Sequence, residues 1–161
     1  MNSYENKRRF VLPLLAALLV IGSADTPAAS VTSTLTIPIA GTVTASPESV
    51  SLSGSIQIVN TLVRDSLLGS PPKVRLSIKL VNVSGVGLST GTKYVATGED
   101  TLLRLLKISD SFEITFPFYR DTPNGRSSAR SALAAITLKF DLLSGTLSGA
   151  TASFSTPSAG V

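Results

Sequence analysis

The chain has 161 residues, a formal net charge of +4, and no histidine, cysteine or tryptophan. Without histidine or cysteine it lacks the usual ligands of zinc, copper and iron, the base of a serine nucleophile, and any means of forming a disulfide. The basic residues beyond the N-terminus are scattered, so a nucleic-acid-binding stripe is not expected. We expect no cofactor and no metal.

The N-terminal 29 residues have the three-part organisation of a secretory signal peptide. A basic cluster at positions 7–9 precedes an apolar run over residues 10–21, and small residues follow, so cleavage is expected near Ala24 or Ala28/Ala29. The apolar run is shorter than the roughly 20 residues that a spanning helix needs. We expect an exported protein, periplasmic or extracellular, with no membrane insertion after cleavage. An uncleaved N-terminal anchor is the alternative.

Two alternating segments open the predicted domain, which spans residues 30–157 and leaves 158–161 as a disordered tail. Over Thr34–Thr44, aliphatic residues alternate with threonines, which predicts a strand with one buried face. Pro38 cannot donate to a ladder and therefore predicts an edge strand. From Val50 to Ile58, serines alternate with aliphatic residues, which is typical of a half-exposed antiparallel strand.

Further strands are predicted along the rest of the chain, with loops between them. The Pro-Pro pair marks Arg64–Pro72 as a loop, and a glycine-rich turn is expected at Ser84–Gly91. Residues 100–108 fit either a short helix or a strand, and Ser127–Ala135 is predicted to be a short helix. The expected strands are 74–80, 94–96, 112–119, 136–142 and 146–155, the last two joined through Ser144-Gly145.

Seven or eight short strands with one or two short helices predict an all-β fold. We expect a single antiparallel β-sandwich, immunoglobulin-like, because short strands with turns at regular intervals are typical of that architecture. An outer-membrane barrel is disfavoured, since the few aromatic residues form no girdles and tryptophan is absent.

Two motif matches in the chain do not carry the chemistry that their patterns suggest. Gly87–Gly91 spells G-x-S-x-G, but no histidine exists to activate Ser89, and Thr92 between Gly91 and Lys93 breaks a phosphate-loop pattern. Ser70 to Lys73 matches the spacing of a serine–lysine dyad, but the Pro-Pro pair disfavours the helix that such a dyad needs. No catalytic residue is assigned.

The acidic residues leave one enzymatic alternative, a small secreted hydrolase using two carboxylates. The acids that could form such a pair are Glu99, Asp100, Asp110, Glu113 and Asp121. Residues 121–125 are oxygen-rich, but they do not match a calcium loop and are predicted to be a β-turn.

The densest aromatic and charged stretch is residues 116–121. Its alternation places the phenylalanines inward and leaves Tyr119 and Arg120 near a strand end. If the protein has a ligand surface, Tyr94, Tyr119 and Arg120 are its candidate residues, because tyrosine and arginine dominate binding interfaces.

The sequence therefore predicts an exported, non-catalytic module that binds a partner or forms part of a cell surface. The partner, a protein or a surface polymer, is not identified by any motif. A self-assembling fibre or matrix subunit is the alternative, in which Thr34–Thr44 would complete the sheet of another copy to give a homo-oligomer.

Overall fold

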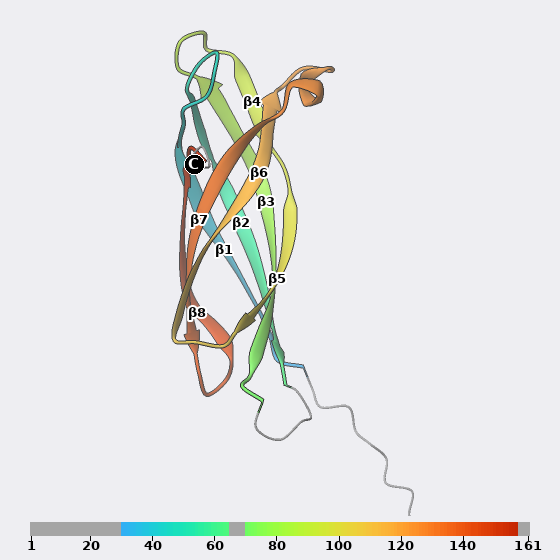
Figure 1. Cartoon of the computed structure of the whole chain (residues 1–161), viewed down its shortest axis with the longest axis vertical. Coiled ribbons are helices and arrows are strands. Elements are labelled where there is room, and N and C mark those ends of the chain that lie inside the picture. The colour runs from blue at the N-terminus through green and yellow to red at the C-terminus, as the bar shows by residue number, and fades with distance from the viewer. Residues whose placement is uncertain (1–29, 65–69, 158–161) are drawn as a thin grey trace, which may run out of the picture.

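The computed structural model describes residues 30–64 and 70–157 and shows an all-β chain (Figure 1). The predicted signal peptide, part of the predicted 64–72 loop and the predicted C-terminal tail lie outside the described residues. The described residues form eight strands and one turn of 3-10 helix: β1 Thr32–Val43, β2 Val50–Val63, β3 Lys73–Gly87, β4 Lys93–Ala96, β5 Glu99–Leu105, β6 Ser109–Arg120, η1 Gly125–Ser128, β7 Arg130–Asp141 and β8 Thr146–Ser155.

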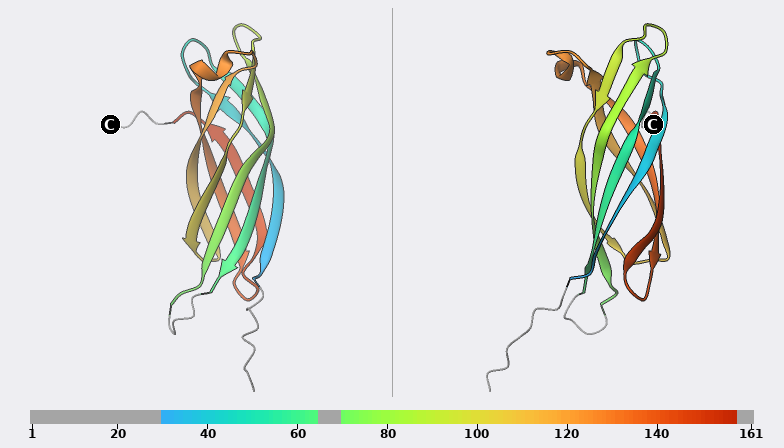
Figure 2. Two further views of the ribbon diagram at one scale, coloured as in Figure 1. Left: turned by 90° about the vertical axis from the view of Figure 1, so that its right-hand side faces the viewer. Right: turned by 180° about the vertical axis from the view of Figure 1, so that it is seen from behind.

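Seven of these strands form a closed barrel. Around the barrel the order is β1, β2, β3, β4, β6, β7 and β8, and β8 returns to β1 (Figure 2). Six of the seven interfaces are antiparallel, and the β1–β8 interface is parallel. An odd number of strands that run alternately up and down must produce one parallel interface where the ring closes.

The predicted immunoglobulin-like sandwich is therefore wrong. A sandwich consists of two sheets with separate edges, whereas here β2 pairs with β1 on one side and with β3 on the other, along nearly its whole length. The remaining neighbours continue this pairing until β8 meets β1. Alternating strands with one buried face suit both architectures, and only the long-range pairings distinguish them.

Strand β5 lies outside the barrel ring. The long strand β3 pairs with β4 near its end, over Val83–Val86, and with β5 near its beginning, over Lys73–Lys79. Because β4 pairs with β6 over only three residues, the chain beyond Gly98 separates from β6 and follows β3 alone. Side chains, rather than a hydrogen-bonded ladder, join β5 to β6.

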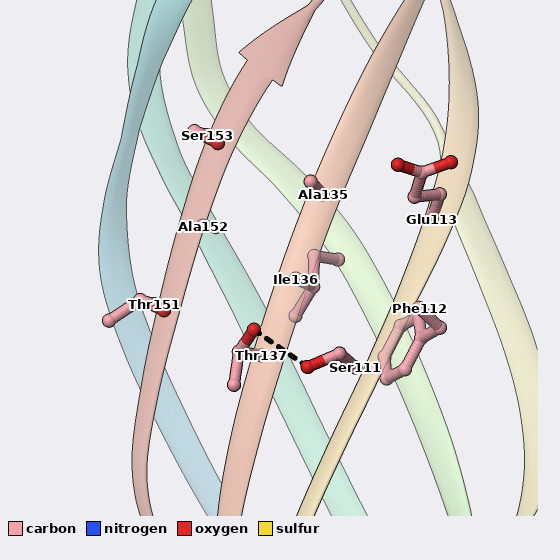
Figure 3. Close-up of a pocket in the computed structure, with 9 residues that line it drawn as sticks. All are labelled: Ser111, Phe112, Glu113, Ala135, Ile136, Thr137, Thr151, Ala152 and Ser153. Atoms are coloured by element: carbon pink, nitrogen blue, oxygen red, sulfur yellow. Dashed lines mark hydrogen bonds between the residues drawn. The ribbon is translucent and has the colours of Figure 1, made fainter.

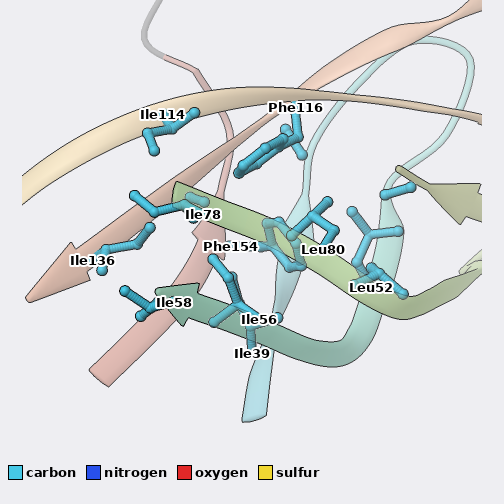
Figure 4. Packing of buried hydrophobic residues seen from close by; sticks show 14 of the residues in the cluster. Ile39, Leu52, Ile56, Ile58, Ile78, Leu80, Ile114, Phe116, Ile136 and Phe154 are labelled. Carbon is cyan, nitrogen blue, oxygen red and sulfur yellow. The ribbon is translucent and has the colours of Figure 1, made fainter. Parts of the chain in front are cut away.

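The barrel interior is a packed apolar core (Figure 4). The predicted inward residues of β2 and β6 are confirmed, since Leu52, Ile56, Phe116 and Phe118 are buried. Small inward residues of β7 lie beside the large ones of β6: Ala132 is paired with Phe116. Aliphatic and aromatic side chains fill the interior, as expected for a barrel of this size.

The ring closes where β1 meets β8. One parallel bridge joins Ala40 to Ser153, and a Cβ added to Gly41 would overlap the carbonyl oxygen of Phe154. Glycine at position 41 therefore permits the two backbones to approach closely. The prediction that Pro38 marks an edge strand is wrong, because β1 lies between β2 and β8, although its ladder to β8 is minimal.

Two local predictions are resolved by the structure. Residues 99–105 form a strand rather than a helix.

The predicted helix over 127–135 is wrong: η1 ends at Ser128 and β7 begins at Arg130. Tertiary pairing overrides the helical propensity of this alanine-rich segment, because β7 is paired with both β6 and β8. The other predicted strands are confirmed, and the glycine-rich segment ends β3 and turns into β4.

The barrel has two ends that differ in composition. The upper end, at the top of Figure 1, comprises the loops at 44–49, 88–92 and 121–129. The lower end comprises residues 30–31, 70–72, 106–108 and 142–145. No helix in the described ranges is long and apolar enough to cross a membrane.

Candidate functional site: an arginine-lined mouth at the upper end

Two arginines and a tyrosine line the mouth of the barrel at its upper end. Tyr94 of β4 is paired with Arg120 of β6, and Arg130 of β7 is paired with Phe118 of β6. Directly paired residues of antiparallel strands project from the same face. Because Tyr94 and Phe118 are buried inside the barrel, both arginine positions belong to its inner face, at the level where it opens.

These side chains border a cavity of about 330 Å³. Its lining residues are Ser46, Pro47, Tyr94, Arg120, Ser128 and Arg130. The lining therefore contains two guanidinium groups and two hydroxyl-bearing serines but no carboxylate from the described part of the chain. Such a lining offers hydrogen-bond donors and positive charge to whatever occupies the cavity.

Arg130 is held in place by aromatic rings and backbone carbonyls. Its guanidinium carbon lies 4.8 Å from the ring centroids of both Tyr94 and Phe118, within the range of cation–π attraction. Its Nη1 donates to the carbonyl oxygens of Ser46 and Glu48, at 3.2 and 3.3 Å. Arg130 thereby joins the 44–49 loop to β7.

Glu48 joins the same loop to the turn between β3 and β4. Its carboxylate accepts hydrogen bonds from the backbone N–H groups of Ser89 and Thr90, the hydroxyl of Thr90 at 2.8 Å and the hydroxyl of Tyr94 at 3.0 Å. These donors, with the Thr90 hydroxyl foremost, lower the pKa of Glu48. The carboxylate is ionised at neutral pH and fully occupied by protein donors.

Gly87 provides the space for that carboxylate. A Cβ added to Gly87 would overlap the carboxyl atoms of Glu48. Glycine is therefore required at the end of β3 by close packing, because any side chain would displace the acid.

The two mouth arginines are not neutralised by a carboxylate. Within residues 30–64 and 70–157, Arg104–Asp110 is the one ion pair, and it joins the end of β5 to the start of β6, on either side of the lower-end turn at 106–108. Arg120 is exposed and forms no side-chain hydrogen bond to another described residue. The upper mouth thus retains positive charge and free donors.

The three residues predicted from the sequence do not form one site. Tyr94 and Arg120 line the same cavity, but Tyr119 does not. The Tyr119 hydroxyl lies 3.5 Å from that of Thr97 and accepts from Nε of Arg126 at 3.2 Å, and Arg126 also lies over its ring. Hydrogen bonds from Thr97 and then Arg126 lower the pKa of Tyr119.

The acidic residues considered for hydrolysis are engaged in structural contacts or lie apart. Asp110 forms a bidentate pair with Arg104, and Glu99 accepts from the hydroxyl of Ser77. The Arg104 hydrogen bonds lower the pKa of Asp110, whereas a general acid of a glycosidase needs a raised pKa. Among described residues, no group of three acidic side chains could hold a metal ion.

A second recess, of about 450 Å³, crosses the outer surface of β6, β7 and β8 (Figure 3). Hydroxyl and methyl groups dominate its lining, and Ser111 and Thr137 share a hydrogen bond of 2.9 Å across two strands. Glu113 is its one charged lining residue. The described residues that line the recess include no arginine or lysine, whereas the upper mouth contains two arginines, so the recess is the weaker candidate for a binding site.

Sequence reasoning did not find Glu48 or Arg130. Arg130 fell within a segment interpreted as a helix, which hid its position on the inner face of a strand. Glu48 did leave a signal, because it is the single charged residue between Ser30 and Val63. A lone acid among serines, threonines and aliphatic residues is a candidate for a buried structural role.

Comparisons with known proteins do not connect this chain to a characterised one. No family model, no curated protein and no solved structure matches the chain. Its function must be argued from its own residues.

Proposed function

We propose that this protein is an exported, non-catalytic binding module that holds an anionic group of its partner in the upper mouth of the barrel. The observation that carries the proposal is the cavity lining, in which Arg120 and Arg130 face one space without an opposing carboxylate. Export is inferred from the basic, apolar and small-residue segments of the first 29 residues.

The chemistry of the lining favours a carboxylate, phosphate or sulfate group. A guanidinium presents donors in a planar fork that matches two oxygens of such a group. The hydroxyl of Ser128 donates to the Gly125 carbonyl, so it helps to shape the cavity wall beside Arg120. A volume of about 330 Å³ suits one acidic group with a few attached atoms, such as a polymer side group or chain end.

The mouth is organised before any ligand arrives. Arg130 is held by two rings and two carbonyls, and Glu48 fixes the neighbouring turn. A preorganised donor loses less conformational entropy on binding than a mobile one. The same contacts support a non-catalytic role, since the Glu48 carboxylate, which contacts the lining residue Tyr94, is occupied by four donors and has a lowered pKa.

The test compares two arginine substitutions that remove the same charge. Arg120→Gln removes a mouth donor, whereas Arg126→Gln removes an arginine that contacts Tyr119 outside the cavity. Binding of inorganic phosphate, sulfate and citrate is measured by calorimetry at fixed ionic strength. We expect about a tenfold or greater loss of affinity for Arg120→Gln, as for loss of a charged hydrogen bond, and a change below about twofold for Arg126→Gln.

Equal losses in the two variants would show that net charge, rather than the mouth, governs binding. Absence of binding to all three anions in the unmodified protein would also contradict the proposal.

A self-assembling subunit is the second candidate, favoured by the single bridge between β1 and β8. Release of β1 there would let it pair with another copy by strand exchange. Light scattering over a range of concentrations, on the full chain and on a version starting at Pro47, tests this. Assembly predicts large species that the truncation abolishes while its β-sheet circular dichroism persists. A monomer whose truncation unfolds would instead assign β1 to its own barrel, where Ile39 and Val43 are buried.

A further inference from the structure

The lower end of the barrel exposes large apolar side chains on two adjacent turns. Ile108 is 70% exposed in the β5–β6 turn, and Leu142 and Leu143 are 48% and 93% exposed in the β7–β8 turn. The backbone N–H of Phe140 donates to the Ile108 carbonyl at 3.0 Å, so the β5–β6 turn lies beside the end of β7 that leads into the β7–β8 turn. Exposed apolar groups gathered at one end indicate a contact surface.

The β7–β8 turn is firmly held, although its leucines are exposed. Both carboxylate oxygens of Asp141 accept hydrogen bonds, one from the backbone of Leu143 at 2.9 Å and one from the hydroxyl of Ser144 at 3.0 Å. The buried Asn60 donates to the carbonyl of Gly145 at 2.7 Å. Leu143 therefore projects from a fixed turn, and its exposure is a property of the fold.

Basic residues lie in the β5–β6 turn and in the strand ends that adjoin the two turns. Lys73 is paired with Leu105, Arg75 with Leu103, and Lys139 with Ser109, while Lys107 lies in the β5–β6 turn itself. The acids described nearby are engaged, since Asp110 is paired with Arg104 and Asp141 with its own turn. The lower end therefore combines apolar tips with an excess of positive charge.

We propose that the lower end rests on an anionic lipid surface, with Ile108, Leu142 and Leu143 in the interfacial region and the surrounding cations at the headgroups. Apolar tips combined with lysine and arginine are the chemistry that anionic membranes attract. Resting on the surface needs no spanning segment in the barrel. This inference concerns the opposite end from the anion-binding mouth and does not depend on it.

The described chain begins at the same end of the barrel, and a second copy is a less suitable occupant of this end than a lipid surface. The described chain begins at Ser30 on the lower end, where the Val31 carbonyl accepts from the backbone of Leu62. The described chain therefore enters the barrel at the end that carries the apolar tips. A second copy is a poorer occupant, because two lower ends facing each other would oppose two groups of cations.

The absence of tryptophan from the chain permits a direct test. Leu143→Trp places one reporter at the lower tip, and Leu88→Trp places a matched reporter at the upper end, where Leu88 is 63% exposed. The full chain carrying either reporter is mixed with phosphatidylcholine vesicles, with and without phosphatidylglycerol, and with lipids brominated in their acyl chains. With anionic vesicles, we expect a blue shift and strong quenching of tryptophan fluorescence for Leu143→Trp, and neither for Leu88→Trp.

A charge variant separates tip contact from tethering by the N-terminal segment. Adding Lys107→Gln and Lys139→Gln to the Leu143→Trp chain keeps residues 1–29 intact. We expect the partitioning of the tip to fall about fivefold for each cation removed. Equal quenching at both ends, no quenching at either, or a charge variant that behaves like its parent would overturn the proposal. A blue shift that grows with protein concentration without vesicles would assign the surface to a second copy and overturn it as well.

Discussion

The two ends of the barrel close the same apolar core by different means. At the upper end, Glu48 and Arg130 join the 44–49 loop to the 88–92 turn and to strand β7 through hydrogen bonds, and an arginine-lined cavity lies beside them. At the lower end, the Arg104–Asp110 pair joins β5 to β6, and apolar turn residues project outward. The barrel walls hold the core, whereas the two ends present different chemistry: arginines at the upper end and exposed apolar turn residues at the lower end.

The Arg104–Asp110 pair takes the place of a missing ladder. Strands β5 and β6 share no backbone pairing, yet Nε and Nη2 of Arg104 donate to the two carboxylate oxygens of Asp110 at 2.7 and 3.0 Å. Arg104 also lies over the ring of Phe112, at 5.6 Å from its centroid. This contact covers the core where the hydrogen-bonded wall is interrupted.

The largest expected effect comes from disturbing the upper end at Gly87. Gly87→Ala places a Cβ where the Glu48 carboxylate lies, and overpacking of this kind costs about 1–3 kcal/mol of unfolding free energy. Urea unfolding measures the loss, and phosphate binding at the mouth should weaken with it. Gly149→Ala is the matched control, because a Cβ there meets nothing within 4 Å. Equal stability of the two variants would mean that Glu48 does not organise the upper end.

A smaller loss is expected when the lower end is disturbed at Asp110. Asp110→Asn removes the charge that pairs with Arg104, whose side chain is 38% exposed. Partial exposure to water limits the expected cost to about 1 kcal/mol. Hydrogen exchange of β5 amides should accelerate, while that of β2 amides stays unchanged. Glu113→Gln on the same strand serves as the control, since Glu113 is exposed; matching exchange in both variants would contradict a bridging role.

The smallest expected effect is a loss of folding stability at low pH, to which both ends contribute. The pKa of Glu48 is lowered from its usual 4.5 and that of Asp110 from its usual 3.8, by Thr90 and Arg104 respectively. A lowered folded-state pKa gives stability that is present above the usual value and lost as pH falls through the folded value. Melting temperature should therefore be flat from neutral pH to about pH 5 and fall below about pH 4.

Substitution then separates the contributions of the two ends to this acid dependence. Glu48→Gln should reduce the fall in melting temperature at acid pH and leave the part of that fall that is due to Asp110. Asp110→Asn should leave the part that is due to Glu48. If the melting temperature of both variants depends on pH as in the unmodified protein, the acid sensitivity belongs to other carboxylates.

Much of the wall of the barrel could be predicted from the sequence. Alternation of serine with aliphatic residues identified β2 and its buried face, and the phenylalanines of β6 were placed inward correctly. These are local patterns, and the period of two that produces them is a property of any strand. For the same reason they could not reveal whether the sheet closes.

Closure and the upper mouth depend on contacts between distant residues. The approach of β1 to β8 at Gly41 joins segments from opposite ends of the described chain, and no local pattern records it. Arg130 was missed because serine and alanine around it favour a helix, whereas the large side chains of β6 require small neighbours on β7. Tyr94 and Arg120 were identified by residue type, and their shared cavity became evident only from the register of β4 with β6.

The adjacency of β1 and β8 also has a consequence for how the chain acquires its structure. The first and last strands complete the ring, so the barrel cannot close before the C-terminal strand is available. Until that strand is available, the earlier strands have unpaired edges, which is a state prone to misassembly. Pairing between sequence-distant strands is also intrinsically slow. We therefore expect refolding to be slow for a chain of this size, with closure of β1 against β8 as a late event.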